Sequence, residues 1–194
     1  MDKVSYALGL SMGNNFRSSG IKKLDVQEFT KGINDVLNDN SLAMTYDEAQ
    51  ELLNTFFSNL QNEKLEINKQ AGEEFLRINK ERPGVKTTAS GVQYEILKEG
   101  EGAKPKATDK VTVHYEGKLI NGQVFDSSIQ RGEPATFGLN QVIPGWTEAL
   151  QLMPKGAKYR IYLPSELAYG EQGAGEMIEP NSTLVFDVEL LDIV

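Results

Sequence analysis

The residues of this chain that could support chemistry are mostly aromatic, and they gather in its second half. Six large rings and one carboxylate stand out there: Tyr115, Phe125, Asp126, Phe137, Trp146, Tyr169 and Phe186. Aromatic side chains in a small domain of strands belong to its core by default. A functional role for these rings must therefore be argued from the sequence motifs in which they occur.

The usual catalytic groups are absent. The chain has no cysteine, which excludes disulfides, thiolate catalysis and thiolate metal sites. One histidine, His114, leaves almost no metal chemistry of the histidine-cluster kind. Neither a phosphate loop nor a Gly-x-Ser-x-Gly elbow is present. We therefore expect no cofactor and no metal.

Five short motifs give the second half a recognisable order. They are Val113–Gly117 (Val-His-Tyr-Glu-Gly), Gly122–Ser128, Val142–Trp146 (Val-Ile-Pro-Gly-Trp), Ala168–Gly170 and Leu184–Leu191. Together they resemble the FKBP-type peptidyl-prolyl cis/trans isomerases, over about residues 88–194. The N-terminal half is similar to the helical dimerisation module of the two-domain bacterial Mip, FkpA and FKBP22-like group, on looser patterning such as Val4–Gly9.

This resemblance implies a half-open sheet wrapped on a short helix, with a shallow apolar pocket between them. Trp146 would form the floor under a proline ring, and the Ile143 N–H and the Tyr169 hydroxyl would hold substrate carbonyls. The implied catalytic residues are Tyr115, Phe125, Asp126, Trp146, Tyr169 and Phe186. The implied substrate-binding residues are Phe137, Val142, Ile143, Met177 and Ile178.

The chemistry of proline isomerisation suits such a set of residues. Rotating a prolyl amide costs roughly 18–20 kcal/mol, because the twisted state loses C–N double-bond character. No proton moves and no covalent intermediate is needed, so an enzyme has only to bind the twisted amide better than the planar forms. A dry aromatic slot disfavours the dipolar planar amide, and hydrogen bonds to the flanking peptide orient it.

Several of these residues also have purely structural interpretations. Asp126 could cap a turn with Ser127 and Ser128. Trp146 follows Pro-Gly at a helix start, where a bulky core anchor is common. His114 lies between two inward-pointing positions of its strand, so we expect it to face away from the pocket and assign it no role.

The sequence departs from the small eukaryotic relatives at the pocket rim. Ala174 stands where they carry a histidine, Ala135 stands where they carry an aromatic residue, and Glu176 adds a charge. A macrolide inhibitor is a candidate partner, and these changes bear on its affinity and on substrate preference. They leave the pocket floor and walls in place.

Period-two patterns predict that strands position these residues. Apolar and polar residues alternate from Val92 to Ile96, from Val111 to Tyr115, from Tyr159 to Leu163 and from Leu184 to Leu190, as in half-buried antiparallel strands. Asn121-Gly122 is a strong hairpin signal. Only residues 146–150, opened by Pro144-Gly145, resemble a short helix.

The first 82 residues have helical patterns. Asp25 to Glu28 resembles a capping box, and a second box from Thr45 to Glu48 opens a much longer segment. No proline interrupts it before Pro83, so one helix of roughly 37 residues and about 55 Å is expected. Its apolar stripe is dense up to Leu60 and thin afterwards, which predicts a largely solvated second half.

The dense apolar stripe in the first half of the long helix must be buried against another surface. The short segments that precede this helix are too short to bury it alone. We expect a second copy of the chain to provide that surface, which gives a homodimer through residues 1–60. An intramolecular helical bundle is the alternative.

Residues 83–91 are rich in small and polar residues and mark the boundary between two domains. We expect a helical dimerisation domain with its long linker helix in residues 1–82 and the isomerase domain in residues 83–194. The expected fold class is α+β: an all-α N-terminal module followed by an FKBP-like antiparallel half-barrel sheet on a short helix.

Charge and hydropathy narrow the partners and the location. The net charge is −8, and both halves are acidic, which argues against nucleic acid and weakly against an anionic membrane surface. Residues 1–12 contain no secretory or membrane-spanning run. We expect a cytoplasmic protein as written, and a periplasmic one if a signal peptide has been removed.

The expected clients are proline-containing polypeptides, whose folding the enzyme would assist. One alternative is a holdase chaperone or proline-peptide binding module with incidental isomerase activity. It predicts that residues 1–82 alone protect clients from aggregation. A metal-linked isomerase with an inserted flap domain is a third possibility, but one histidine and a short 171–179 loop argue against it.

Overall fold

The computed structural model describes all 194 residues, which form two compact units, 1–63 and 64–194. Helix α3 (Tyr46–Asn79) belongs to both, with its first half in the first unit and its second half in the second. The predicted domain boundary at residues 82/83 lies just after this helix. The compact units divide earlier because the second half of α3 packs on the sheet.

The first unit contains helices α1 (Lys3–Ser18), α2 (Val26–Leu37) and the first half of α3. Asp25 caps α2 by accepting hydrogen bonds from the backbone N–H groups of Gln27 and Glu28, at 2.9 and 3.1 Å. The predicted box at α3 is also formed. The Glu48 carboxylate accepts from the Thr45 N–H at 2.7 Å, and the Glu48 N–H donates to the Thr45 hydroxyl at 3.2 Å.

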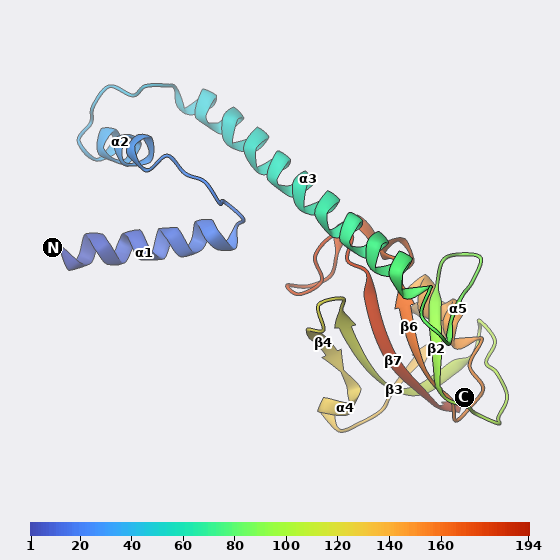
Figure 1. Ribbon diagram of the computed structural model, residues 1–194. Helices are drawn as coiled ribbons and strands as arrows, with labels where there is room; N and C mark the ends of the chain where they lie inside the picture. Colours follow the sequence, from blue (N-terminus) through green and yellow to red (C-terminus); the bar gives the residue numbers. More distant parts are fainter. The chain divides into compact units, whose positions relative to one another are not determined.

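The second unit is built on one seven-stranded antiparallel sheet (Figure 1). Its strands are β1 (Val85–Thr87), β2 (Gln93–Lys98), β3 (Lys110–Leu119), β4 (Val124–Ser127), β5 (Ala135–Gly138), β6 (Lys158–Leu163) and β7 (Leu184–Ile193). The order is β1-β2-β6-β7-β3-β4, with β5 paired to β3. The α+β fold class and the antiparallel sheet expected from the alternating patterns are confirmed.

Two short helices complete the second unit. The four-residue α4 (Ser128–Arg131) follows β4, and α5 (Pro144–Leu150) begins at the predicted Pro-Gly pair. Short 3-10 turns lie at Leu139–Gln141, Ser165–Leu167 and Gly170–Gln172. Asn121 and Gly122 form the hairpin between β3 and β4, and Gly122 has the positive φ (+88°) that its turn requires.

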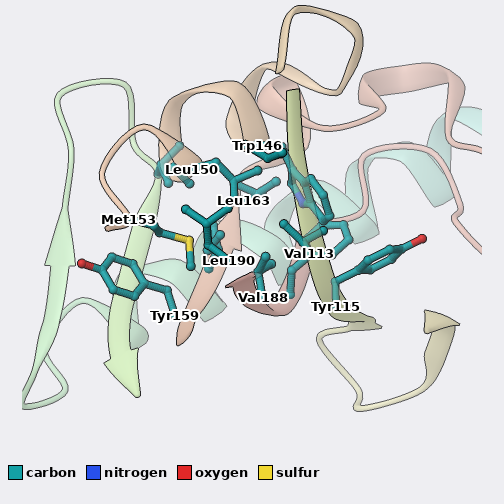
Figure 2. Close-up of a cluster of buried hydrophobic side chains, with 14 of the residues drawn as sticks. Val113, Tyr115, Trp146, Leu150, Met153, Tyr159, Leu163, Val188 and Leu190 are labelled. Atoms are coloured by element: carbon teal, nitrogen blue, oxygen red, sulfur yellow. The ribbon is translucent and has the colours of Figure 1, made fainter. Parts of the chain in front are cut away.

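The core lies between α5 and one face of the sheet (Figure 2). Residues of β3, β6 and β7 that point inward are fully buried there: Val111, Val113, Ile161, Leu163, Leu184, Val188 and Leu190. Trp146, Ala149 and Leu150 of α5 pack into the same cluster. The period-two pattern thus places one side of each strand against α5.

The second half of α3 contacts the opposite side of the sheet. Phe75 lies 6.0 Å from the Tyr162 ring, and the buried Asn79 donates to Gln93 at 2.8 Å. The sequence predicted a largely solvated segment here. Its outer side is exposed as expected, but its inner side is held by aromatic and amide contacts that the thin apolar stripe did not reveal.

Candidate active site

Trp146 lies at the centre of the aromatic group. Three rings meet its indole edge to face, with centroids 5.2 Å (Tyr115), 5.3 Å (Phe186) and 5.7 Å (Phe137) away. Only 4% of Trp146 is exposed, so the indole forms a floor beneath the other rings. Figure 2 shows the Tyr115 ring beside it, with the tyrosine hydroxyl pointing away from the core.

Phe125 and Phe186 form a second edge-to-face pair, with ring centroids 5.6 Å apart. Both rings lie against the backbone of Gly117 in β3. A Cβ built on Gly117 would meet Phe125 at 2.6 Å and Phe186 at 2.8 Å. The position of these two rings therefore depends on the absence of a side chain at residue 117.

A polar cluster borders the rings. The Tyr115 hydroxyl donates to one oxygen of the Asp126 carboxylate, and Arg131 donates to the other. Arg131 also donates to the Tyr115 oxygen at 3.0 Å, and its guanidinium lies 5.6 Å from the Tyr115 ring centre. A guanidinium over an aromatic face is attractive, so both partners hold Arg131 in place.

The charges in this cluster are fixed over the neutral pH range. Burial alone would raise the pKa of Asp126, but hydrogen bonds from Tyr115 and Arg131 outweigh it and lower the pKa below 3.8. Burial raises the pKa of Tyr115 above 10.0, and its hydrogen bond to Asp126 adds to the rise. Asp126 is thus a carboxylate and Tyr115 a neutral phenol.

Two hydrogen-bond donors at the rim are unused. The backbone N–H of Ile143, just before α5, donates to no group of the chain, while the Ile143 carbonyl accepts from the Trp146 N–H at 2.9 Å. The Tyr169 hydroxyl makes no hydrogen bond, and the residue is 40% exposed. Burial raises the pKa of Tyr169, and the negative charge of Asp126 adds to it, so this hydroxyl keeps its proton.

The other expected site residues lie around the same cluster. Phe137 on β5 is 6.0 Å from the Tyr115 ring, and the half-buried Val142 and Ile143 pack against the core. Ile178 is buried in the cluster that contains Trp146 and Phe186. Met177, one residue earlier, lines a neighbouring cleft instead.

Sequence reasoning missed two residues that organise the polar cluster. Arg131 closes it, and the only available signal was a cation at the end of the short helix five residues after Asp126. Ser128 is fully buried; its hydroxyl accepts from the Tyr115 N–H at 2.8 Å and donates to the Tyr115 carbonyl at 3.2 Å. These two hydrogen bonds hold the backbone of Tyr115 in place. His114 also contacts the Ser128 hydroxyl, at 3.0 Å.

This arrangement suits binding and orientation better than covalent chemistry. The floor and walls are aromatic, and the one carboxylate is already engaged by two donors. The free donors at the rim are the Ile143 N–H and the Tyr169 hydroxyl. Such a site can hold an apolar ring and fix the carbonyl groups of the chain on either side of it.

Comparison with protein families assigns both halves of the chain. Residues 101–191 match the family described as FKBP-type peptidyl-prolyl cis-trans isomerase. Residues 1–96 match the family described as the domain amino terminal to FKBP-type peptidyl-prolyl isomerase.

Relatives and solved structures of similar sequence span nearly the whole chain. A probable FKBP-type isomerase FkpA of Neisseria meningitidis is 46% identical, over 100% of this chain and 74% of its own. The FKBP-type 22 kDa isomerase of Escherichia coli is 45% identical, over 98% and 94%. The crystal structure of FkpA from Escherichia coli matches with a TM-score of 0.79 and 39% identity, covering 98% of this chain and 95% of that one.

Proposed function

Because the chain belongs to the FKBP-type peptidyl-prolyl cis/trans isomerases, we propose which of its residues carry the isomerisation of X–Pro bonds. The enzyme acts on peptides and proteins, as the resemblance at residues 88–194 implied. The family descriptions do not favour the holdase or binding-module alternative.

In this proposal, the proline ring of the client lies on the Trp146 indole. Phe125, Phe137 and Phe186 are its walls, and they exclude water from the prolyl amide. A dry slot of this kind disfavours the dipolar planar amide relative to the twisted one. The enzyme thereby lowers a barrier of roughly 18–20 kcal/mol without moving a proton.

The rim donors orient the client. The Ile143 N–H and the Tyr169 hydroxyl, both unused in the free enzyme, donate to the carbonyls of the residues that flank the bond. Asp126 stays ionised beside the bond, held by Tyr115 and Arg131. Val142, Met177 and Ile178 contact the neighbouring client residues. The observation that carries this assignment is the conjunction of a ring-lined floor with an unpaired N–H at its edge.

The test is an isomerisation assay on a short proline peptide. Trp146→Ala and Asp126→Ala should each lower kcat/KM about tenfold or more, and Tyr169→Phe should lower it several-fold. Tyr159→Phe is a matched control, because Tyr159 is a buried tyrosine of the same core that lies outside the proposed pocket. Undiminished turnover in the Trp146 and Asp126 variants would contradict the assignment.

The same pocket is the proposed site for a macrolide inhibitor. Ala174 and Ala135 flank it with small side chains, so we expect weak competition with the peptide substrate and a gain in affinity from Ala135→Tyr. A competition measurement on both proteins tests this expectation. Equal inhibition of the two would contradict it.

We further propose that the chain is a homodimer through residues 1–60. The first unit has almost no interior of its own, since Asp35 is its only buried residue. Between α2 and the first half of α3 lies an apolar hollow of about 680 Å³, lined by Phe29, Ile33, Val36, Leu37, Leu52 and Leu53. An exposed hollow of this kind typically marks an association surface. We propose that a second copy of the chain covers this hollow, because the second copy exposes the same apolar helix surface.

For the location, we propose the bacterial cell envelope. No helix of the chain is long and apolar enough to cross a bilayer. The support comes from a relative in Legionella longbeachae, 43% identical, which is named an outer membrane protein. Cell fractionation with an antibody against the native protein tests this, and recovery in the cytoplasmic fraction alone would contradict it.

A further inference from the structure

A cleft lies next to the residues of the proposed proline pocket, within the unit 64–194. It has a volume of about 380 Å³ and is walled by α3, by the β3–β4 hairpin and by the segment before β7. Ala71 lies on the first wall, Leu119 and Gln123 on the second, and Glu176 and Met177 on the third. Cavities that hold ligands typically begin at about this size.

The wall formed by α3 is fixed to the rest of the unit. Asn68 donates to the Pro180 carbonyl at 2.9 Å, and Asn181 donates to the Leu65 carbonyl at 3.2 Å. Lys64 and Glu179 form an ion pair at 3.7 Å. The cleft is therefore held by direct hydrogen bonds on both sides and is a built feature of this unit.

Strand β3 runs from the buried residues of the proposed pocket to the wall of the cleft, so it gives the separation of the two. Tyr115, Gly117 and Leu119 point to the same side of the sheet, because side chains alternate along a strand. Tyr115 lies beside Trp146, Gly117 supports Phe125 and Phe186, and Leu119 lines the cleft. At about 3.3 Å per residue, Leu119 is roughly 7 Å from Gly117 and 13 Å from Tyr115.

An extended client peptide advances by the same length per residue. A chain whose proline lies on Trp146 therefore reaches the cleft two to four residues away from that proline. The loop before β7 also links the proposed pocket to the cleft. Ile178 is buried in the cluster with Trp146, and its neighbour Met177 lines the cleft.

The lining of the cleft suits a polypeptide. The Gln123 side-chain amide has no hydrogen-bond partner in the chain, and Asn121 uses only its carbonyl oxygen, which accepts from the Gln123 N–H at 2.9 Å. Free amides can donate to and accept from a peptide backbone. The Glu176 carboxylate has no cationic partner, and Leu119 and Met177 add apolar surface. A lysine or arginine of the client suits this lining. Its apolar stem can contact Leu119 and Met177, and its charged end can pair with Glu176.

We propose that this cleft is a second contact site for the client polypeptide. It takes the extended segment two to four residues from the proline and prefers a lysine or arginine there. The inference rests on the proline pocket proposed above. The site raises the affinity for long chains, because a client held at the pocket presents its neighbouring segment at a high effective concentration.

The test fills the cleft without touching the pocket. Ala71→Trp places an indole in the cleft from the exposed face of α3, and Gln70→Trp places one on the same helix outside it. Substrates are a short proline peptide and two versions extended by four residues, including a lysine, on the N- or C-terminal side. Ala71→Trp should lower kcat/KM about fivefold or more for at least one extended peptide and leave the short one unchanged. Gln70→Trp should change neither.

Equal loss on the short peptide would overturn the proposal, since the substitution would then act through the pocket or the fold. Unchanged kcat/KM on both extended peptides would overturn it as well. Failure of the pocket assignment is seen separately, as undiminished short-peptide turnover in Trp146→Ala.

The charge preference has its own variant. Glu176→Gln should reduce the preference for lysine over glutamine in the extended peptide several-fold at low salt, and added salt should reduce it in the wild type, because the pair is exposed and screened. Glu166→Gln, an exposed position outside the cleft, is the matched control. An unchanged lysine preference in Glu176→Gln would overturn this part of the proposal.

Discussion

At the scale of single residues, the site is characterised by groups that do not titrate near neutrality. The pKa of Asp126 is held below 3.8, and those of Tyr115 and Tyr169 are raised above 10.0. We expect kcat/KM on a short peptide to be flat from about pH 5 to about pH 9, because no group of the proposed mechanism changes charge there. A pH–rate profile checks this, and a bell-shaped curve within that range would contradict a mechanism without proton transfer.

The same shifts give the sign of the stability effect. Asp126 has a lower pKa in the folded than in the unfolded state, so its contribution is present above about pH 3.8 and is lost as the pH falls through the folded value. Asp126→Asn should therefore destabilise the protein most at neutral pH, and the loss should shrink as the pH falls through the lowered pKa of the folded state. Urea titrations at neutral and at acidic pH measure the difference.

Gly117 supplies a second prediction at this scale. A methyl group at residue 117 would collide with Phe125 and Phe186, whose nearest ring atoms would lie 2.6 and 2.8 Å away. Gly117→Ala should cost about 1–3 kcal/mol of unfolding free energy and lower kcat/KM about tenfold, because both walls must move. Thermal unfolding and the short-peptide assay measure the two effects. Wild-type kcat/KM in this variant would show that the walls do not shape the pocket.

At the scale of elements, the sequence predicted the helices and strands that have a periodic apolar pattern. It missed the features that depend on single contacts between residues far apart in the chain. Alternation predicted the long strands, Asn121-Gly122 predicted their hairpin, and Pro144-Gly145 predicted the start of α5. β1, β5 and α4 are too short for any period to show. Helix α1 extends from Lys3 to Ser18, although its glycines and asparagines are weak helix formers.

The site divides in the same way. The aromatic residues were recognisable because their motifs are contiguous in sequence. Arg131 and the α3 wall of the cleft were not, because their roles come from contacts across the fold. Asn68 and Pro180, for example, are more than a hundred residues apart and meet through one amide hydrogen bond.

Gly72 tests the docking of α3 on the sheet. It is buried, and a Cβ at this position would collide with the Thr183 hydroxyl. Alanine in place of glycine normally stabilises an open helix by up to about 1 kcal/mol. Gly72→Ala should instead destabilise the protein by about 1–3 kcal/mol, because α3 and the segment just before β7 cannot both keep their positions.

Two further variants make this measurement specific. Glu73→Ala, on the exposed side of α3 one residue later, should be neutral or slightly stabilising, because alanine is a good helix former. Thr183→Ala removes the hydroxyl, so the Gly72→Ala/Thr183→Ala double variant should lose less than the sum of the two single losses. Simple additivity in chemical denaturation would show that α3 does not press on Thr183.

At the scale of the whole molecule, the two units differ in what they can do alone. The unit 64–194 has a closed core and carries the proposed pocket. The unit 1–63 exposes most of its large apolar side chains, among them Leu8, Leu52, Leu53, Phe56 and Phe57. A unit without a core contributes little stability by itself, so its exposed surface is best explained by association.

Leu53→Glu is the decisive change for the proposed dimer, because it puts a charge into the apolar hollow between α2 and α3. Light scattering should give twice the chain mass of 21.5 kDa for the wild type and for Gln50→Glu, an exposed control on the same helix, but one chain mass for Leu53→Glu. Short-peptide turnover should stay unchanged, since one pocket suffices. Refolding of a proline-rich protein should slow several-fold, because two linked pockets hold a long client better than one. A Leu53→Glu dimer would contradict this interface.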